Sequence, residues 1–277
     1  MDLTISIVTY RNNRDMLLKA IDSALNTKLN IRLYISDNSP TDEFRNLSDD
    51  PRVEYLFNNA NDGFGVGHNI VMRKILDVSK YHLVLNPDVY FEGGVLEELF
   101  NYMEQHPDIG IITPRVLYPD GSPQYVSKLL PTPWDFFVRR FLKIPFLLKK
   151  VNYRLEMQFS GYNKIMTVPY MQGSFMLIRN KALKEHGLFD ERIFMYMEDG
   201  DLSRRLLEGG YRNIYYPYVT IYHGYARGAH KNLKLMWYAI HGIIIYFNTW
   251  GWFFDKSRKI INDKVIKEIQ NDHTSQS

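Results

Sequence analysis

Three acidic side chains crowd one short stretch of the chain, Phe194 to Tyr211 (FMYMEDGDLSRRLLEGGY). Glu198, Asp199 and Asp201 follow an apolar run and precede leucines at helical spacing, which predicts a buried loop that delivers carboxylates to a helix N-terminus. The helix dipole favours ionised carboxylates there. The plainer interpretation is an acidic first turn with a helix cap. A cluster of acids in this setting is also typical of a catalytic site, where one carboxylate acts as a general base.

Further polar residues come directly after predicted strands. Buried apolar runs at 4–10, 31–36, 53–57 and 81–85 are separated by helical patterns, which predicts a largely parallel α/β sheet. Asp37 and Asp88 follow two of these runs, at the edge where open α/β sheets bind ligands. A carboxylate there suits a hard cation. An Asx turn at Asp37 and a simple turn aspartate at Asp88 are the alternatives.

A glycine-rich segment, Asn61-Asp62-Gly63-Phe64-Gly65-Val66-Gly67-His68-Asn69, precedes a predicted helix that runs through Leu76. Glycines before a helix N-terminus present backbone N–H groups to an anion, so this segment predicts a phosphate site. The spacing is G-x-G-x-G, whereas dinucleotide-binding folds use G-x-G-x-x-G. An NAD(P)-binding oxidoreductase is therefore the minor alternative.

The second half of the sequence is less regular. A helix over 94–105 and a strand over 109–113 are followed by a proline-rich span, 114–167, with a basic and aromatic block that begins at Trp134. This block either docks on a membrane surface or covers an acceptor cleft. One strand is predicted over Val168 to Ile178, with Gly173 where a backbone or a ligand comes close.

Two more strands are predicted near Asn213 to Tyr216 and Val219 to Tyr222, and His223 follows the second of them. A histidine at this point can face the same edge as Asp88, although lone histidines are more often structural. Arg204 is expected to be a structural partner of the acids at 198–201.

The composition fits a globular enzyme. The 277 residues are 45% hydrophobic and 23% charged, which is enough for a full core. A net charge of +3 does not indicate nucleic-acid binding, and the absence of cysteine excludes disulfides and fits a reducing compartment. The N-terminus does not resemble a signal peptide, so a cytoplasmic location is expected.

The apolar and aromatic stretch Leu235 to Phe254 is followed by Lys256, Arg258 and Lys259. Tryptophans beside basic residues favour a helix pair that lies on an anionic membrane. Docking on the protein core and a membrane span are the alternatives.

Taken together, the segments TISIVTYRNN, SDNSPTD, NNANDGFGVGHN, NPDV, QGSFMLIR, GLFDERIFMYMEDGDLSRRL and IYHG resemble the inverting glycosyltransferases of family 2, in order and spacing. The similarity covers about 4–224 and is strongest to the bacterial rhamnosyltransferase-like branch. It implies a GT-A fold, with a mixed, mostly parallel sheet flanked by helices and a C-terminal helical extension. The implied division is 1–113 for the nucleotide-sugar half, 114–228 for the acceptor half and 229–277 for a membrane-associating extension.

The resemblance also implies roles for individual residues. Asp199 is the implied catalytic base, Asp88 and His223 the implied ligands of Mg²⁺ or Mn²⁺, and Arg227 and His230 an implied lid over the diphosphate. Asn86 stands where a metal-binding motif has its other aspartate, and Asn38-Ser39-Pro40 departs from the usual N-G-S. The nucleotide and donor residues expected from the resemblance and the glycine segment are Thr9, Tyr10, Arg11, Asp37, Asn61, Gly63, Gly65, Asn69, Asn86 and Asp88. The expected acceptor residues are Gly173, Glu198 and Trp134.

The implied reaction is transfer of a sugar from a nucleoside diphosphate, with dTDP-L-rhamnose as the expected donor and a UDP- or GDP-sugar as the alternative. The expected acceptor is a lipid-linked glycan that is extended into a cell-surface polysaccharide (O-antigen or cell wall). The enzyme itself is expected to be peripheral to the inner face of the bacterial membrane. A homodimer is left open. A non-catalytic sugar-binding protein is the remaining alternative of another class.

Overall fold

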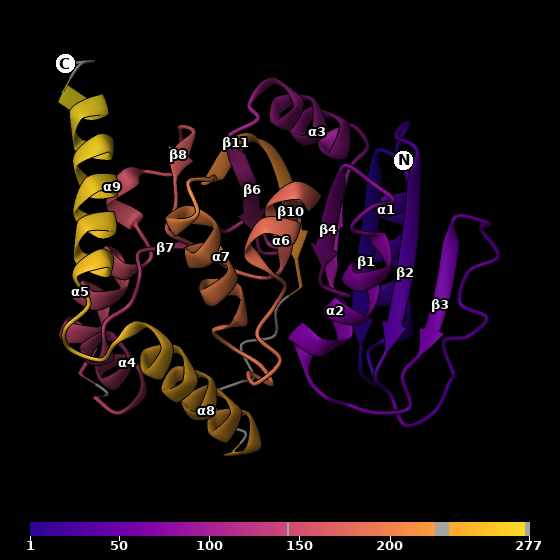
Figure 1. Cartoon of the computed structure of the whole chain (residues 1–277), viewed down its shortest axis with the longest axis horizontal. Coiled ribbons are helices and arrows are strands. Elements are labelled where there is room, and N and C mark those ends of the chain that lie inside the picture. The colour runs from indigo at the N-terminus through magenta and orange to yellow at the C-terminus, as the bar shows by residue number, and fades with distance from the viewer. Residues whose placement is uncertain (143, 225–232, 275–277) are drawn as a thin grey trace.

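The computed structural model describes residues 1–142, 144–224 and 233–274, and shows a mixed α/β fold. Figure 1 shows the sheet with helices on both faces and two long helices at the C-terminal side. The strands are β1 (Leu3–Thr9), β2 (Ile31–Asp37), β3 (Val53–Phe57), β4 (Tyr81–Leu85), β5 (Val89–Phe91), β6 (Ile109–Leu117), β7 (Ser127–Lys128), β8 (Met166–Thr167), β9 (Tyr170–Met171), β10 (Phe175–Arg179) and β11 (Arg212–His223). The helices are α1 (Arg14–Leu25), α2 (Phe64–Ile75), α3 (Val95–Gln105), α4 (Pro133–Arg140), α5 (Pro145–Leu155), the 3-10 turn η1 (Gln158–Ser160), α6 (Asn180–His186), α7 (Glu198–Glu208), α8 (Leu233–Trp250) and α9 (Lys256–Thr274).

Within the described residues the main sheet has nine strands, in the order β3-β2-β1-β4-β10-β6-β11-β5, with β8 beside β11. Six strands run in one direction, while β10, β5 and β8 run against their neighbours. The expected mixed, mostly parallel sheet is therefore confirmed. Strands β1, β2 and β4 end at one edge, which places the residues that follow them side by side.

Successive side chains of β1 and β4 point to opposite faces of the sheet. Ile5 and Ile7 belong to the apolar core that α1 and α3 cover. Between them, Ser6 points to the α2 side, where its hydroxyl lies 2.6 Å from His68 Nδ1 and 2.7 Å from His82 Nε2. Burial lowers the pKa of His82 to about 3, so this buried cluster is held together by neutral hydrogen bonds.

Two predicted elements were wrong in their extent. The single strand expected over 168–178 is divided into β9 and β10, because the Gly173 N–H between them donates to Asp199 instead of to a neighbouring strand. The two strands expected at 213–216 and 219–222 are one long strand, β11, with a register shift between Tyr216 and Thr220. Pro217 lies in that interval and has no N–H to give to a ladder.

The C-terminal helices dock on the core along part of their surface. Tyr246 and Phe247 of α8 are buried in a cluster with Leu130 and Met197, and α9 adds Val265 to a second cluster. In the described part of the chain, no helix combines the length and the apolarity that crossing a bilayer requires.

Candidate active site

One cavity of about 830 Å³ collects most of the predicted site residues. It opens at the edge where β1 and β4 end and extends to the N-terminus of α7. Of the predicted residues, those that line it are Thr9, Tyr10, Asn61, Gly63, Asn86, Asp88, Gly173, Glu198, Asp199 and His223. Residues separated by more than 200 positions in the chain thus face one space.

Asp199 lies in the first turn of α7 and is buried, with 7% of its surface exposed. Its Oδ1 accepts hydrogen bonds from the Tyr170 hydroxyl at 2.9 Å and the Gly200 N–H at 2.8 Å, and its Oδ2 accepts one from the Gly173 N–H at 2.8 Å. A carboxylate offers about four lone-pair positions, so three are used to orient the group and one remains for a proton in the cavity. This is an oriented carboxylate of the kind that a general base requires.

Glu198 precedes Asp199 and has a different environment. Its Oε2 is buried and has no hydrogen-bond partner among the described residues. Burial, and then the neighbouring Asp199 carboxylate, raise the pKa of Glu198 well above its ordinary value. The neutral form of Glu198 is therefore favoured.

The loop before these acids has an unusual backbone. Tyr196 and Met197 have φ angles of 69° and 90°, in the left-handed region that bulky residues rarely adopt. Two neighbours hold the loop in this form. Phe194 stacks on Tyr238 of α8 at 3.9 Å between ring centroids, and a Cβ on Gly242 of α8 would lie 2.3 Å from the Tyr196 carbonyl oxygen. Helix α8 therefore packs directly against the loop that presents Asp199.

The helix cap that the acidic turn suggested is absent from α7, and Asp201 has other partners. Met197 occupies the N-cap position and no side chain caps the helix. The Asp201 carboxylate instead accepts hydrogen bonds from Arg205 Nε and Trp250 Nε1, both at 2.8 Å. Arg204 also differs from expectation, because it pairs with Asp255 at 2.7 and 2.8 Å and with Glu208 at 2.9 Å, and with none of the three acids of the turn.

At the opposite end of the cavity, Asp88 Oδ1 lies 3.3 Å from His223 Nε2. Gln124 fixes the tautomer of this histidine: its amide NH₂ donates to the His223 carbonyl at 2.8 Å, so its Oε1, 3.0 Å from His223 Nδ1, must accept that ring proton. The Nε2 lone pair then accepts from the Asn86 amide NH₂ at 3.3 Å and lies beside Asp88, so this nitrogen is the one that could ligate a metal.

The described residues contain no group of three or more His, Asp or Glu side chains arranged to hold a metal ion. Two protein ligands nevertheless fit a cation that is completed by substrate phosphate and water, as Mg²⁺ commonly is. The donor set, one carboxylate and one imidazole, suits Mg²⁺ or Mn²⁺.

Several of the residues predicted to bind the nucleotide-sugar donor do not line the cavity. Asp37 is fully buried, where its Oδ1 accepts from the Ser39 N–H and its Oδ2 from the Tyr55 hydroxyl, which is the Asx-turn geometry. Arg11 is exposed, with its N–H donating to the Ser39 hydroxyl. Asn69 is buried and clamps the backbone of Phe189 through both ends of its amide.

The glycines of the predicted phosphate segment are required by close packing. A Cβ on Gly63 would lie 2.2 Å from the Phe194 carbonyl oxygen, and the same oxygen accepts a hydrogen bond from the Phe64 N–H at 2.9 Å. A Cβ on Gly65 would press on Phe189 at 3.0 Å. The N-terminus of α2 is thus joined to the loop that carries Asp199.

On the acceptor side, Trp134 is exposed on α4, where it stacks on Phe137, and it does not line the cavity. Arg227 and His230, the predicted lid, lie outside the described residues. Sequence reasoning missed other lining residues, among them Asn12, Gln124, Lys128, Arg139 and Tyr170. Apart from Arg139, which lies on α4 in the basic and aromatic block, they lie in loops and strands of two residues without periodic patterns, so only the three-dimensional fold reveals them.

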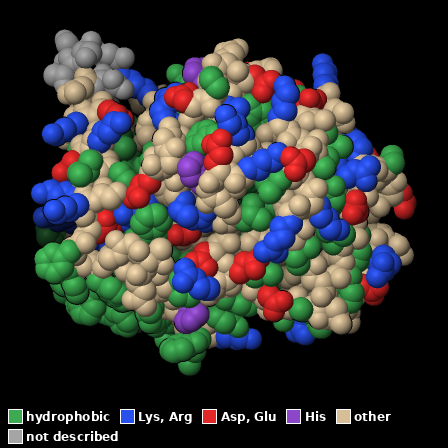
Figure 2. Space-filling model, viewed as in Figure 1, with side chains coloured by type: hydrophobic (Ala, Val, Ile, Leu, Met, Phe, Trp, Pro, Cys, Tyr) green, Lys and Arg blue, Asp and Glu red, His purple; other side chains and the backbone are tan. Residues whose placement is uncertain are grey.

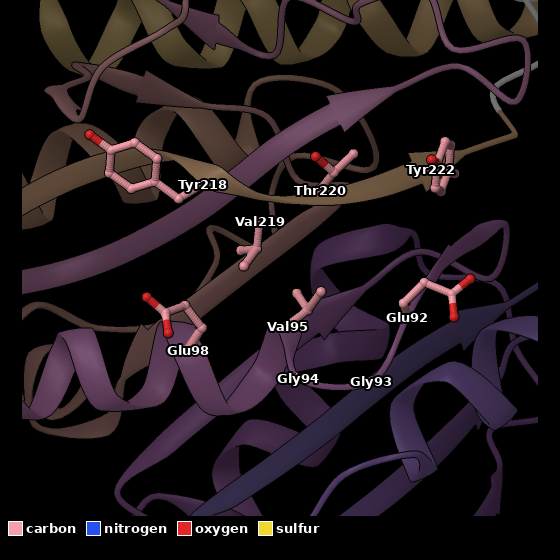
Figure 3. A pocket seen from close by; sticks show the side chains of 9 residues that line it. All are labelled: Glu92, Gly93, Gly94, Val95, Glu98, Tyr218, Val219, Thr220 and Tyr222. Atoms are coloured by element: carbon pink, nitrogen blue, oxygen red, sulfur yellow. The ribbon is translucent and has the colours of Figure 1, made fainter.

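A second hollow of about 520 Å³ lies between the start of α3 and β11 (Figure 3). Its lining includes Glu92, Glu98 and Tyr218 but none of the predicted site residues. The chemistry that the sequence indicates is therefore concentrated in the larger cavity.

Comparison with known proteins decides the family. The family model described as glycosyl transferase family 2 matches residues 4–187. The chain belongs to glycosyl transferase family 2. The match ends before α7 and β11, so Asp199 and His223 lie beyond the matched residues. Membership sets aside the oxidoreductase alternative.

Two similar curated proteins are rhamnosyltransferases. The chain is 27% identical over 237 residues to an N-acetylglucosaminyl-diphospho-decaprenol L-rhamnosyltransferase of Mycobacterium tuberculosis, covering 80% of this chain and 75% of that protein. It is 29% identical over 178 residues to rhamnosyltransferase WbbL of Escherichia coli, covering 61% and 62%. A low-salt glycan biosynthesis hexosyltransferase, Agl10 of Haloferax volcanii, is 28% identical over 206 residues, covering 74% and 61%.

Two solved structures share the fold. GalNAc-T7 with UDP, GalNAc and Mn²⁺ has a TM-score of 0.63 at 14% identity, covering 82% of this chain and 44% of that one. The mannosyltransferase PcManGT of Pyrobaculum calidifontis, in complex with GDP-Man and Mn²⁺, has a TM-score of 0.57 at 14% identity, covering 89% and 64%. The chain spans less than two thirds of either structure. The likeness confirms the GT-A architecture with a C-terminal helical extension.

Proposed function

We propose that this enzyme transfers L-rhamnose from dTDP-L-rhamnose to a lipid-linked glycan, with inversion at the anomeric carbon and with Asp199 as the general base. The observation that carries the proposal is the single cavity that joins the oriented Asp199 carboxylate to the Asp88 and His223 pair. Similarity to two rhamnosyltransferases, one of them named for a diphospho-decaprenol acceptor, supports the choice of donor and acceptor.

In the proposed reaction the acceptor hydroxyl attacks the anomeric carbon as the bond to the nucleoside diphosphate breaks. Asp199 takes the hydroxyl proton through its remaining lone pair, while the Tyr170 hydroxyl and the Gly173 N–H keep the carboxylate in place. Asp88 and His223 would hold a divalent cation, which would supply charge neutralisation for the departing diphosphate. The proposed domain division places the donor in 1–113 and the acceptor in 114–228.

The donor is identified by a binding screen. We expect dTDP to bind in the presence of Mn²⁺ at least tenfold more tightly than UDP or GDP, measured by calorimetry, and L-rhamnose to be the sugar transferred. Tighter binding of UDP or GDP would select the alternative donor class. Nucleotide binding without sugar transfer to any lipid-linked acceptor would support a non-catalytic sugar-binding protein.

The metal site has its own prediction. We expect Asp88→Ala and His223→Ala to abolish the gain in dTDP affinity that Mn²⁺ gives the wild-type protein, because each variant removes one of two protein ligands. Calorimetry with Mn²⁺ and with EDTA measures this gain. Glu92→Ala, at the second hollow, is the matched control and should retain it. An unchanged gain in both site variants would remove these residues from the metal site.

We also propose that the enzyme lies on an anionic membrane surface, at the inner face of the bacterial membrane, through an aromatic face formed by α4, α8 and the turn that follows α8. Phe254 is 99% exposed, Phe253 78% and Trp237 64%. Trp134, Phe137 and Phe141 are exposed on α4, which touches α8 through Phe136 and Phe247. Figure 2 shows hydrophobic side chains gathered at the lower left, where Figure 1 places α4 and α8. Exposed aromatic residues beside basic ones favour the membrane interface.

A further inference from the structure

The wall of the cavity nearest the aromatic face carries two cations, Lys128 and Arg139, and one carboxylate, Glu156. Helices α4 and α5 together carry five basic residues, Arg139, Arg140, Lys149, Lys150 and Arg154, and one acid, Asp135. Arg139 lines the cavity and donates to Glu156 at 3.0 Å. The same pair of helices thus faces the membrane side with aromatic rings and the cavity with a guanidinium group.

Lys128 adds a second cation to this wall. It lies opposite Tyr170 in the β7–β9 ladder, with its Nζ 5.0 Å from the Tyr170 ring centroid and 3.4 Å from Gln172 Oε1. Among the described residues it forms no ion pair with a carboxylate. Lys128 and Arg139 line the same cavity. Burial, and then the guanidinium of Arg139, lower the pKa of Lys128, and the charges of Asp199 and Glu156 offset this only in part. An anionic ligand in direct contact with the half-buried ammonium would reduce the remaining cost of its burial.

These groups follow one another in a definite order. The exposed rings of α4 come first, then Arg139 and Lys128, then Tyr170, whose hydroxyl contacts Asp199. An acceptor built as lipid, diphosphate and sugar has its parts in the same order, with the reacting hydroxyl at the sugar end. The donor diphosphate is assigned elsewhere, to the Asp88 and His223 end of the cavity.

We propose that Lys128 and Arg139 form an anion subsite that binds the diphosphate of a lipid-linked acceptor. The acceptor is recognised by its charge at the boundary between the membrane and the cavity, and its sugar is thereby directed past Tyr170 to Asp199. This inference rests on the proposed function and names the chemical class of its acceptor.

Binding without turnover tests the subsite directly. Geranyl diphosphate is the probe, titrated by calorimetry into the full chain in EDTA, so that a metal at Asp88 and His223 cannot bind it. We expect Lys128→Met to weaken binding at least tenfold and Arg139→Gln at least threefold, because each removes a positive charge. Lys149→Met removes the same charge from an exposed position outside the cavity and should bind as the wild type does.

Two further ligands distinguish the sources of the diphosphate. With Mn²⁺ present, the affinity for dTDP should be the same in Lys128→Met and wild type, and a tenfold loss there would assign Lys128 to the donor. Inorganic pyrophosphate should bind more weakly than geranyl diphosphate. Equal binding of the two would overturn the lipid-linked assignment, and equal binding of geranyl diphosphate to wild type and Lys128→Met would overturn the subsite itself.

Kinetics then separates this inference from the proposed function. Lys128→Met should raise KM at least tenfold for a lipid-diphosphate sugar and leave KM unchanged for the same sugar on a neutral alkyl chain. If the wild type transfers sugar to neither acceptor, the proposed function fails, while the metal-free binding experiment still decides the subsite. An equal rise in KM for both acceptors would contradict recognition of the diphosphate.

Discussion

The two ends of the cavity are built in different ways. The proposed donor end uses residues at the carboxyl ends of strands of one sheet, as Thr9 ends β1 and Asp88 comes after β4. The acceptor end is assembled from α4, α5, β7, β9 and α7, and is held from behind by α8. The proposed nucleotide site is thus formed mainly at one sheet edge, whereas the proposed acceptor site depends on contacts between distant segments.

The largest difference in stability between the two ends should come from the buried ion pair behind α7. Arg204 is 1% exposed, pairs twice with Asp255 and lies 4.2 Å over the Trp250 ring, so it joins α7 to the turn between α8 and α9. We expect Arg204→Met to cost about 3–5 kcal/mol of unfolding free energy, because it removes the two close hydrogen bonds to the buried Asp255 and leaves that carboxylate with Arg258, 3.9 Å away, as its ionic partner. Urea unfolding measures the loss.

Arg32→Met is the matched control at the donor side. Its pair with Glu54 is half exposed and spans 3.5 Å, so its loss should cost less than about 1 kcal/mol. Similar losses in the two variants would mean that the acceptor end does not depend on the C-terminal helices.

Glu198 gives a pH-dependent prediction at the acceptor end. Since its pKa is raised in the folded protein, the folded state keeps a proton that the unfolded chain has already released above its ordinary pKa of 4.5. Stability therefore falls as pH rises from that value to the raised pKa, by about 1.4 kcal/mol per pH unit. Glu198→Gln removes this dependence, so the variant should gain stability over the wild type at pH 8 and little at pH 4.5. Urea midpoints at the two pH values measure it, and an identical pH slope in both proteins would show that Glu198 is ionised.

Substitutions in the aromatic face should have the smallest effect, a weaker binding to membranes. We expect the double variant Phe253→Ser with Phe254→Ser to weaken sedimentation with anionic vesicles about tenfold, because two exposed rings no longer enter the interface. Tyr218→Ser is the control, since Tyr218 is 66% exposed but lies at the second hollow. Equal weakening in both variants, or none in either, would contradict docking through this face.

The sequence predicted the strands at the proposed donor end well, because their signals are local. Strands β3 and β4 have the predicted bounds, since each is a short, mainly apolar run that is followed by polar residues. Asp88 and His223 lie side by side, as the expected shared edge implied, because Asp88 comes after β4 and His223 ends β11. Asp37 and Asn69 were placed within the fold rather than in the cavity, because a sequence pattern does not distinguish a side chain that caps the backbone from one that faces a ligand.

The acceptor end was predicted only at Gly173, Glu198 and Asp199. Lys128 and Tyr170 lie on strands of two residues each, which are too short to show a period. The distant partners of Asp201 and Arg204 are Trp250 at the end of α8 and Asp255 in the turn after it. They lie 49 and 51 positions away, so no local pattern could reveal them. Trp134 was expected at the acceptor and lies on the outer surface of α4, because aromatic residues are typical of membrane surfaces and sugar sites alike.

The central claim is that Asp199 is the general base at the meeting point of the two ends. Single-turnover transfer from dTDP-L-rhamnose by Asp199→Asn tests it most directly, with calorimetry of dTDP on the same protein and Asp201→Asn as the control from the same turn. We predict that Asp199→Asn lowers the rate by about 10²–10⁴ while dTDP affinity stays within twofold, and that Asp201→Asn loses less than tenfold. Near-full turnover by Asp199→Asn, with nucleotide affinity intact, would contradict the account.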